Sequence, residues 1–157
     1  MKYIDSIECS EGHQYLIKFT NCNNLPIVLD VEVVNIDLTL VSNNTPINNA
    51  GTLNKIALMV FNFLDENDVI LYFYCSKEDI NRRNNKTSIT PQEYRSLLFS
   101  TMFEKITKTT KDKTFINKPI ILKDQEWGDH YLHFIAESKY SEKMDSLKEQ
   151  MRLAFEK

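Results

Sequence analysis

Glycine is scarce in this chain of 157 residues, which contains only Gly12, Gly51 and Gly128. Loops that cradle a phosphate need several closely spaced glycines, because the backbone N–H groups must approach the ligand. These three glycines lie far apart along the chain. Walker-type and dinucleotide-binding mechanisms are therefore excluded, and the sequence predicts no nucleotide cofactor.

Paired cysteines and long apolar runs are missing as well. Cys9, Cys22 and Cys75 are an odd number without a CxxC spacing, which argues against a disulfide framework and for a reducing compartment. The first residues contain no apolar signal segment, and no apolar run approaches the ~18 residues that span a bilayer. We therefore expect a cytoplasmic protein that does not enter the membrane.

The charges are distributed unevenly, although the formal net charge is only −3. Residues 1–50 hold two basic and six acidic side chains, whereas residues 77–118 hold ten basic and five acidic ones. A basic segment of this kind is either a solvated face or a docking face for an anionic partner. It provides the first indication of where a binding surface lies.

Three segments have the periodicity or punctuation of helices. Residues 52–64 are apolar on nearly every side, with Thr52 as the expected N-cap, so this helix must be covered on more than one face. A second helix is expected to begin after Thr90, which is followed by Pro91 and Glu93 in the pattern of a capping box. The last helix starts near Ser141, and its single apolar stripe is Met144, Leu147, Met151 and Phe155.

Strands are predicted from alternating or continuous apolar runs. They cover residues 15–19, 27–33, 36–40, 69–74, 115–122 and 130–136. The helix at 52–64 can act as a crossover between the strands near 36–41 and 69–74, which would make that pair parallel. The sequence thus predicts a single α+β domain over residues 1–157, with a mostly antiparallel or mixed sheet packed by three to four helices in a two-layer sandwich.

The candidate binding residues follow the buried strand at 69–74, because ligands gather at the carboxyl ends of strands in open sheets. Paired arginines suit a carboxylate or phosphate, since the planar guanidinium donates two hydrogen bonds at once. Ordinary helical ion pairs are the alternative. Trp127 is expected to be exposed in the loop 123–129 and to act as a protein-binding anchor. The candidate set is Lys77, Asp79, Arg82, Arg83, Arg95 and Trp127.

Catalytic and metal-binding arrangements are weaker candidates. Cys75 at a strand end and His133 on a neighbouring strand form a formal Cys/His pair, but a free cysteine is commonly a small buried hydrophobe. His130 and His133 are three residues apart in a strand and therefore point to opposite faces, so they cannot chelate one metal together. We predict no metal site, and no catalytic residue is assigned.

Three stretches resemble a small, uncharacterised family of Bacteroidetes proteins. They are Gly51-Thr-Leu-Asn-Lys-Ile, Val69-Ile-Leu-Tyr-Phe-Tyr-Cys-Ser and Asn84-Asn-Lys-Thr-Ser-Ile-Thr-Pro-Gln-Glu-Tyr-Arg-Ser-Leu-Leu-Phe99. Arg95 and Phe99 match an Arg-x-x-x-Phe-like pattern on the family's helix, while Ser76 stands where the family often has Asp. The resemblance implies a bacterial, cytoplasmic, single-domain protein and brings no activity with it.

The leading hypothesis is a non-catalytic binding module that uses a basic rim to engage a protein or another anionic partner, as a monomer or a homodimer. One alternative is a small hydrolase-like enzyme with its site near Cys75, Asp79 and Arg82. Another is a nucleic-acid-binding protein that uses residues 77–118, whose affinity would fall steeply with salt.

Overall fold

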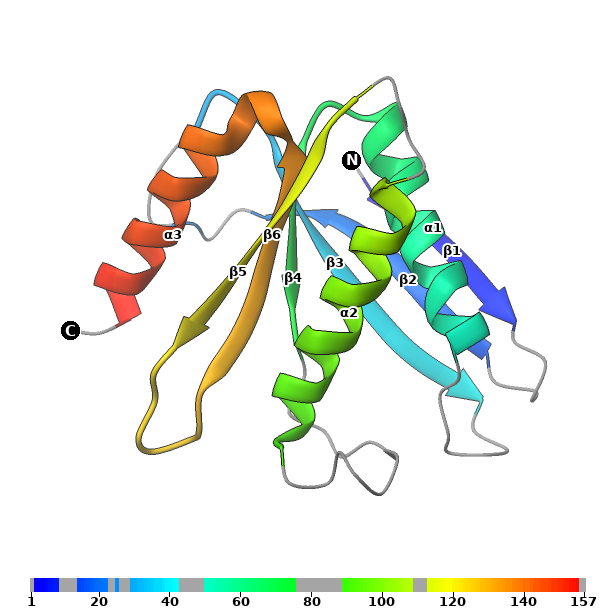
Figure 1. The fold of residues 1–157 in the computed structure, drawn as a ribbon, viewed down its shortest axis with the longest axis horizontal. Coiled ribbons are helices and arrows are strands. Elements are labelled where there is room, and N and C mark those ends of the chain that lie inside the picture. The colour runs from blue at the N-terminus through cyan, green and yellow to red at the C-terminus, as the bar shows by residue number, and fades with distance from the viewer. Residues whose placement is uncertain are drawn as a thin grey trace.

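The structure is a computed structural model that describes residues 2–8, 14–22, 25, 29–42, 50–75, 89–108 and 113–155. These residues form six strands, three α-helices and one 3₁₀ turn (Figure 1). The strands are β1 (Lys2–Glu8), β2 (Gln14–Asn21), β3 (Val33–Ser42), β4 (Ile70–Tyr74), β5 (Phe115–Leu122) and β6 (His130–Glu137). The helices are α1 (Ala50–Glu66), α2 (Pro91–Thr107) and α3 (Ser141–Phe155), with the 3₁₀ turn η2 (Ser138–Tyr140) before α3.

The strands form one mixed sheet in the order β1-β2-β3-β4-β6-β5. The neighbours β3 and β4 are parallel, with Val34 opposite Leu71, and the other adjacent pairs are antiparallel. A parallel pair needs a long crossover connection, which α1 supplies. The expected crossover between these two strands is therefore confirmed, and β4 lies in the middle of the sheet.

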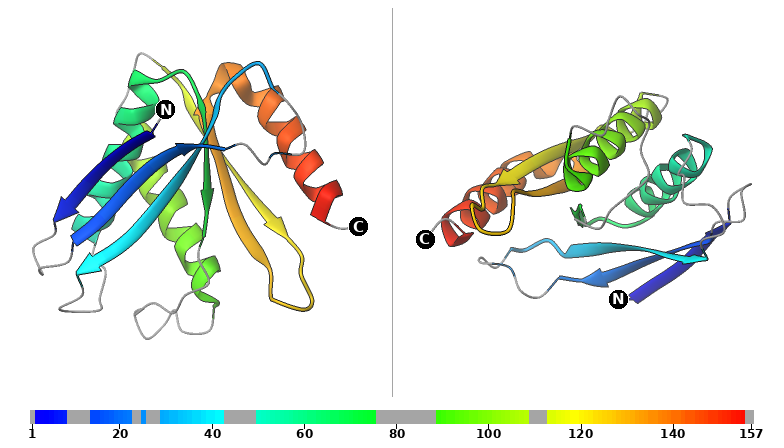
Figure 2. Two further views of the ribbon diagram at one scale, coloured as in Figure 1. Left: turned by 180° about the vertical axis from the view of Figure 1, so that it is seen from behind. Right: turned by 90° about the horizontal axis from the view of Figure 1, so that it is seen from below.

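One face of the sheet is covered by α1 and α2, which lie side by side (Figures 1 and 2). Buried side chains from both helices pack there against alternate residues of the strands, among them Phe19 on β2 and Leu71 on β4. The rings of Phe19 and Phe63 stack with their centroids 4.0 Å apart. The sheet and α2 each cover part of the surface of α1, while Leu58 on its outer side stays 50% exposed.

The opposite face of the sheet has a core of its own. Met144 and Leu147 of α3 are fully buried there against β4, β5 and β6, together with residues such as Ile70 and Phe134. Successive residues of a strand point to opposite faces, so Ile70 and Leu71 serve different cores. The expected two-layer sandwich is therefore wrong for this part of the fold, where α2, the sheet and α3 make three layers.

All three predicted helices are present, although their first and last residues differ in part from the prediction. Thr90 caps α2 as expected, since its Oγ1 accepts the backbone N–H of Glu93 at 3.3 Å. Thr52 is not an N-cap, because α1 already begins at Ala50. The described residues contain three α-helices, so the predicted range of three to four was too wide. None of them combines the length and hydrophobicity that crossing a membrane requires.

The prediction of a strand at 27–33 followed by a break at Asn35 is wrong for the described residues. Residues 29–32 are irregular, and β3 runs without interruption through Asn35. Leu29 and Val31 instead pack against the core beneath α3, where Asp30 also pairs with Lys143. Their alternation with polar residues arises from docking against a helix and not from sheet pairing.

Candidate functional site

Three residues that the sequence analysis considered lie at the end of the sheet where β4 stops: Cys75, Arg95 and Trp127. The backbone N–H of Cys75 donates to the carbonyl of Tyr131 at 2.9 Å, next to the loop that carries Trp127. Arg95 lies on α2 close enough for its charge to act on the Cys75 thiol. The other four candidates, Lys77, Asp79, Arg82 and Arg83, lie outside the described residues.

The loop between β5 and β6 presents Trp127 to solvent, as predicted, with 73% of its surface exposed. The Asp124 carboxylate organises the loop by accepting the backbone N–H groups of Glu126 at 2.9 Å and Trp127 at 3.0 Å. The bond from Trp127 and then the one from His130 hold the pKa of Asp124 below its usual range, and the bond from Glu126 adds a smaller contribution. Gly128 completes the turn with a φ of 86°, a conformation that favours glycine.

Further contacts fix the base of this loop. Lys123 pairs with Asp129 at 2.9 Å, and the carboxylate raises the pKa of the lysine. The side-chain amide of Gln92 on α2 donates to the carbonyl of Asp129, also at 2.9 Å. The loop is thus attached both to its own hairpin and to the first turn of α2.

His130 links this loop to β4 and α3. Its Nε2 lies 2.8 Å from the Asp124 carboxylate, and its Nδ1 lies 2.7 Å from the hydroxyl of Tyr74. Because an ionised carboxylate can only accept, Nε2 carries the proton, and in the neutral ring Nδ1 then accepts from Tyr74. The ring of Phe155 packs edge-on against the imidazole at 4.9 Å. This cluster fastens the loop and the end of α3 to the same strand.

His133 points to the other face, as its spacing from His130 predicted, and is completely buried beneath α2. Its Nδ1 lies 2.7 Å from Asn117 Oδ1, and its Nε2 lies 2.9 Å from Ser96 Oγ. The amide nitrogen of Asn117 donates in turn to Ser100 Oγ at 3.1 Å. Cys75 lies beside the same network, since Ser96 acts on the pKa of its thiol.

Burial determines the protonation of both titratable groups in this network. It lowers the pKa of His133 to about 4, so the ring is neutral near pH 7. It raises the pKa of the Cys75 thiol to about 12, although the charge of Arg95 and the hydrogen bond from Ser96 oppose it. A nucleophilic cysteine needs the thiolate form. Cys75 in this closed arrangement is therefore an unreactive thiol, despite the Cys/His neighbourhood that the sequence suggested.

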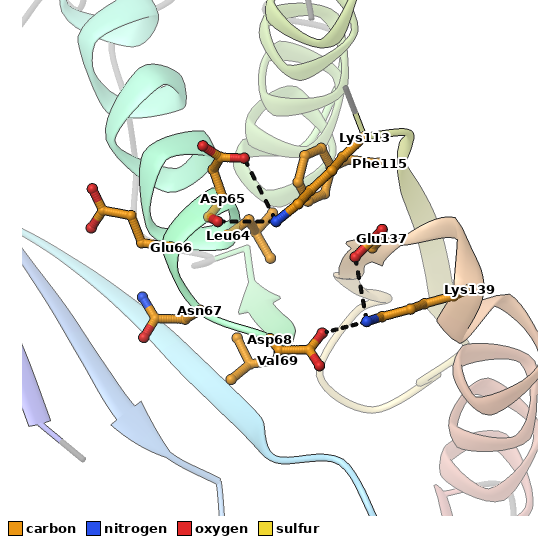
Figure 3. Close-up of a pocket in the computed structure, with 10 residues that line it drawn as sticks. All are labelled: Leu64, Asp65, Glu66, Asn67, Asp68, Val69, Lys113, Phe115, Glu137 and Lys139. Carbon is orange, nitrogen blue, oxygen red and sulfur yellow. Dashed lines mark hydrogen bonds and ion pairs between the residues drawn. The ribbon is translucent and has the colours of Figure 1, made fainter. Parts of the chain in front are cut away.

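A cavity of about 270 Å³ lies at the opposite end of the sheet, where β4 begins (Figure 3). Its apolar lining consists of the buried residues Leu64, Val69 and Phe115. Five of the six charged residues on its walls pair with one another: Lys113 with Asp65, and Lys139 with Asp68 and Glu137. Lys139 lies 3.1 Å from Asp68, and Lys113 donates to the backbone carbonyl of Asp65 at 3.2 Å.

The cavity also carries more acidic than basic side chains, with Asp65, Glu66, Asp68 and Glu137 against Lys113 and Lys139. Asp65 and Glu66 stand at the C-terminal end of α1, where carboxylates oppose the helix dipole. The two lysines come from other segments and offset this charge. In the described part of the chain no group of three or more His, Cys, Asp or Glu side chains could hold a metal ion.

Sequence reasoning did not identify Gln92, Ser96 and Asn117. Ser96 and Asn117 hydrogen-bond His133, and Gln92 bonds the loop that carries Trp127. Gln92 and Ser96 occupy the inner face of a helix that otherwise buries Phe99 and Phe103. Polar residues at core positions of a helix are a signal that could have indicated a buried partner. The identity of the partner, His133, depends on tertiary contacts between three distant segments.

Comparison with known proteins gives no match to a family model, to a curated protein or to a solved structure.

Proposed function

We propose that this chain is a non-catalytic binding module that engages a protein partner with the hairpin loop carrying Trp127. The observation that supports this proposal is the combination of exposure and fixation. Trp127 is 73% exposed, yet its own backbone N–H is held by Asp124. Tryptophan is enriched among the residues that dominate protein interfaces, because one side chain buries a large area and loses little rotational freedom.

Fixation of the loop matters because ordering a flexible loop on binding subtracts from the affinity. The loop is already attached at both ends by the Lys123–Asp129 pair and by the bond from Gln92. A partner that covers the indole therefore meets a surface that needs little rearrangement. Such a surface is better suited to binding than an exposed apolar side chain on a loose segment.

Other exposed apolar side chains lie on the same side of the fold. Ile121, 42% exposed, is opposite Tyr131 in the β5–β6 register. The charge of Glu93 acts on Tyr131, and Leu97 follows Glu93 by one turn of α2 with 51% of its surface exposed. Trp127, Ile121 and Leu97 together are called the hairpin surface here. Its apolar character fits a partner with an apolar pocket for the indole.

The basic rim gives the partner a charge preference in this proposal. Cys75 and Thr90, which flank the segment containing Lys77, Arg82 and Arg83, both belong to this end of the sheet. Arg95 lies at this end of the sheet, and an arginine near an aromatic anchor favours acidic groups on a partner and increases its association rate. We therefore propose an acidic protein surface around the pocket for Trp127, and a cytoplasmic location for the complex.

The hydrolase-like alternative is disfavoured by the burial of Cys75 and by its pKa of about 12. The nucleic-acid alternative is disfavoured by two lysines of the 77–118 segment. Lys113 pairs with Asp65 and Lys118 with Asp145, so these ammonium groups are already neutralised by carboxylates of the same molecule. Free phosphate-binding groups would be needed for a salt-dependent affinity.

The test compares Trp127→Ala with Leu58→Ala in capture of partners from a lysate of the native host. Leu58 is a matched control, because it is 50% exposed on α1 and away from the loop. We expect Trp127→Ala to lose the captured partner and Leu58→Ala to retain it. Trp127 is the only tryptophan of the chain, so its fluorescence should also shift to shorter wavelength when the purified partner is added. Equal capture by both variants would contradict the proposal.

A further inference from the structure

The buried polar side chains of the described residues are concentrated in one place. Gln92, Ser96 and His133 are the buried polar residues of this part of the chain. Ser96 meets His133 beneath the first half of α2, and Gln92 in the first turn bonds the adjoining hairpin loop. In the described part no buried side-chain nitrogen or oxygen lacks a hydrogen-bond partner. The first turns of α2 are therefore attached largely by hydrogen bonds.

The donor and the acceptor can be assigned for each hydrogen bond that links Asn117, His133 and Ser96 beneath α2. Asn117 donates through its amide to Ser100, so its Oδ1 accepts from His133, and His133 Nδ1 carries the proton of the neutral ring. Nε2 then accepts from the Ser96 hydroxyl. Cys75 lies close enough to Ser96 for the hydroxyl group to act on its thiol. Every donor in this closed state is thus matched to one acceptor.

The second half of α2 is attached differently. Phe99 and Phe103 belong to the apolar core shared with α1 and the sheet. Phe99 packs against Phe73 with ring centroids 4.7 Å apart. Water can replace a hydrogen bond when two surfaces separate, but it cannot replace an apolar contact without a large cost. The helix therefore has a first half that can separate from the sheet and a second half that resists separation.

We propose that residues 91–96, the first half of α2, act as a lid that opens over the sheet while Phe99 and Phe103 stay anchored. Opening breaks the bonds of Gln92 and Ser96 and admits water to Cys75 and His133. These two side chains lie on the same face of adjacent strands, because Phe73 is opposite His133 in the β4–β6 register and Cys75 follows two residues later. The open state presents a thiol next to an imidazole, whereas the closed state buries both.

The test measures how fast an aromatic disulfide reagent labels Cys75 under native conditions. The protein used is the full chain with Cys9→Ser and Cys22→Ser, so that Cys75 is the remaining thiol. Partial opening exposes little surface, so its rate depends weakly on urea, whereas global unfolding depends on it strongly. We expect labelling well below the unfolding transition at a rate that hardly changes with urea. A labelling rate that follows the full urea dependence of global unfolding would overturn the proposal.

Two variants in the same background separate the lid from general destabilisation. Ser96→Ala removes its bond to His133, and we expect labelling about tenfold faster in the urea-independent range. Thr101→Ala is the matched control, because Thr101 is exposed on the same helix. Its described hydrogen bond runs from its hydroxyl to the carbonyl of Leu97, within the helix itself. It should leave the rate unchanged. If Ser96→Ala accelerates labelling only where it lowers global stability, the lid does not exist.

Discussion

Two histidines three residues apart show how strongly environment decides the role of a residue. His130 lies at the rim between Asp124 and Tyr74, where the carboxylate fixes its tautomer. His133 is buried under α2 and held neutral between Ser96 and Asn117. The alternation of side chains along β6 separates them by the thickness of the sheet. Of these two histidines, only His133 is buried in the interior, where its ring must stay neutral.

That requirement predicts a loss of stability in acid. The pKa of His133 falls from 6.5 to about 4 in the folded chain, so the unfolded chain binds the extra proton between these two pH values. Stability is therefore complete above about pH 6.5 and decreases as the pH falls, by about 3 kcal/mol once pH 4 is passed. Urea unfolding at a series of pH values measures this loss.

The matched variant for this measurement is His133→Gln, which keeps a donor and an acceptor without a titrating group. We expect it to be less stable at pH 7 but to lose much less stability between pH 6.5 and 4. Asp124 and Asp129 have lowered pKa values, so their contribution is lost at still lower pH and leaves this window nearly unaffected. Identical pH profiles for the two proteins would show that His133 is not the group responsible.

Among the elements, the β5–β6 hairpin and α2 depend on each other. Gln92 attaches the first turn of α2 to Asp129 in the loop, and Gly128 lies beside Gln92. The charge of Glu93 in the same turn acts on Tyr131 of β6 and helps to raise the pKa of that tyrosine. The N-terminal end of α2 and the hairpin loop therefore form one structural unit around the C-terminal end of β4.

Asp124→Ala should loosen the hairpin loop without unfolding the sheet. The substitution removes the acceptor for the N–H groups of Glu126 and Trp127 and for His130. We expect a lower fluorescence anisotropy of Trp127, because the indole gains local motion, together with an almost unchanged far-ultraviolet circular dichroism spectrum. The conservative control Gln125→Ala changes an exposed neighbour that contributes none of these bonds. Unchanged anisotropy in Asp124→Ala would show that the loop is fixed by other contacts.

At the scale of the whole molecule, β4 joins the two parts of the sheet and the two cores. Leu71 belongs to the core under α1 and α2, whereas Ile70 belongs to the core under α3. Both are completely buried. Loss of β4 would open both cores at once, so neither half of the sheet is expected to persist without the other.

This arrangement predicts a single cooperative unfolding transition. Anisotropy of Trp127 reports on the hairpin, and far-ultraviolet circular dichroism reports on all helices and strands. We expect both signals to change at the same urea concentration, as two-state unfolding requires. A hairpin signal that changes at a clearly lower concentration would mean that β5, β6 and α3 unfold as a separate unit. Rare opening of the first half of α2 leaves these midpoints unaffected, because its population is small.

Local patterns predicted the elements that depend on short-range chemistry. The cap at Thr90 and the exposure of Trp127 follow from residues close together in the sequence, and the crossover through α1 follows from the order of the elements along the chain. The strand expected at 27–33 failed because apolar alternation also arises when an irregular segment packs on a helix. The resemblance to the Bacteroidetes family stays a prediction, and so do the rim residues outside the described part of the chain.

The amino-acid sequence by itself determined that this is an α+β chain without phosphate loops, with an apolar central strand and a lone tryptophan in a turn. Composition and periodicity are local properties, and they are enough for these statements. Only the tertiary structure decided that Ser96, Asn117 and His133 meet beneath α2 and that α3 covers the opposite face. Such contacts join segments tens of residues apart, and their energies depend on burial and geometry that no single segment carries.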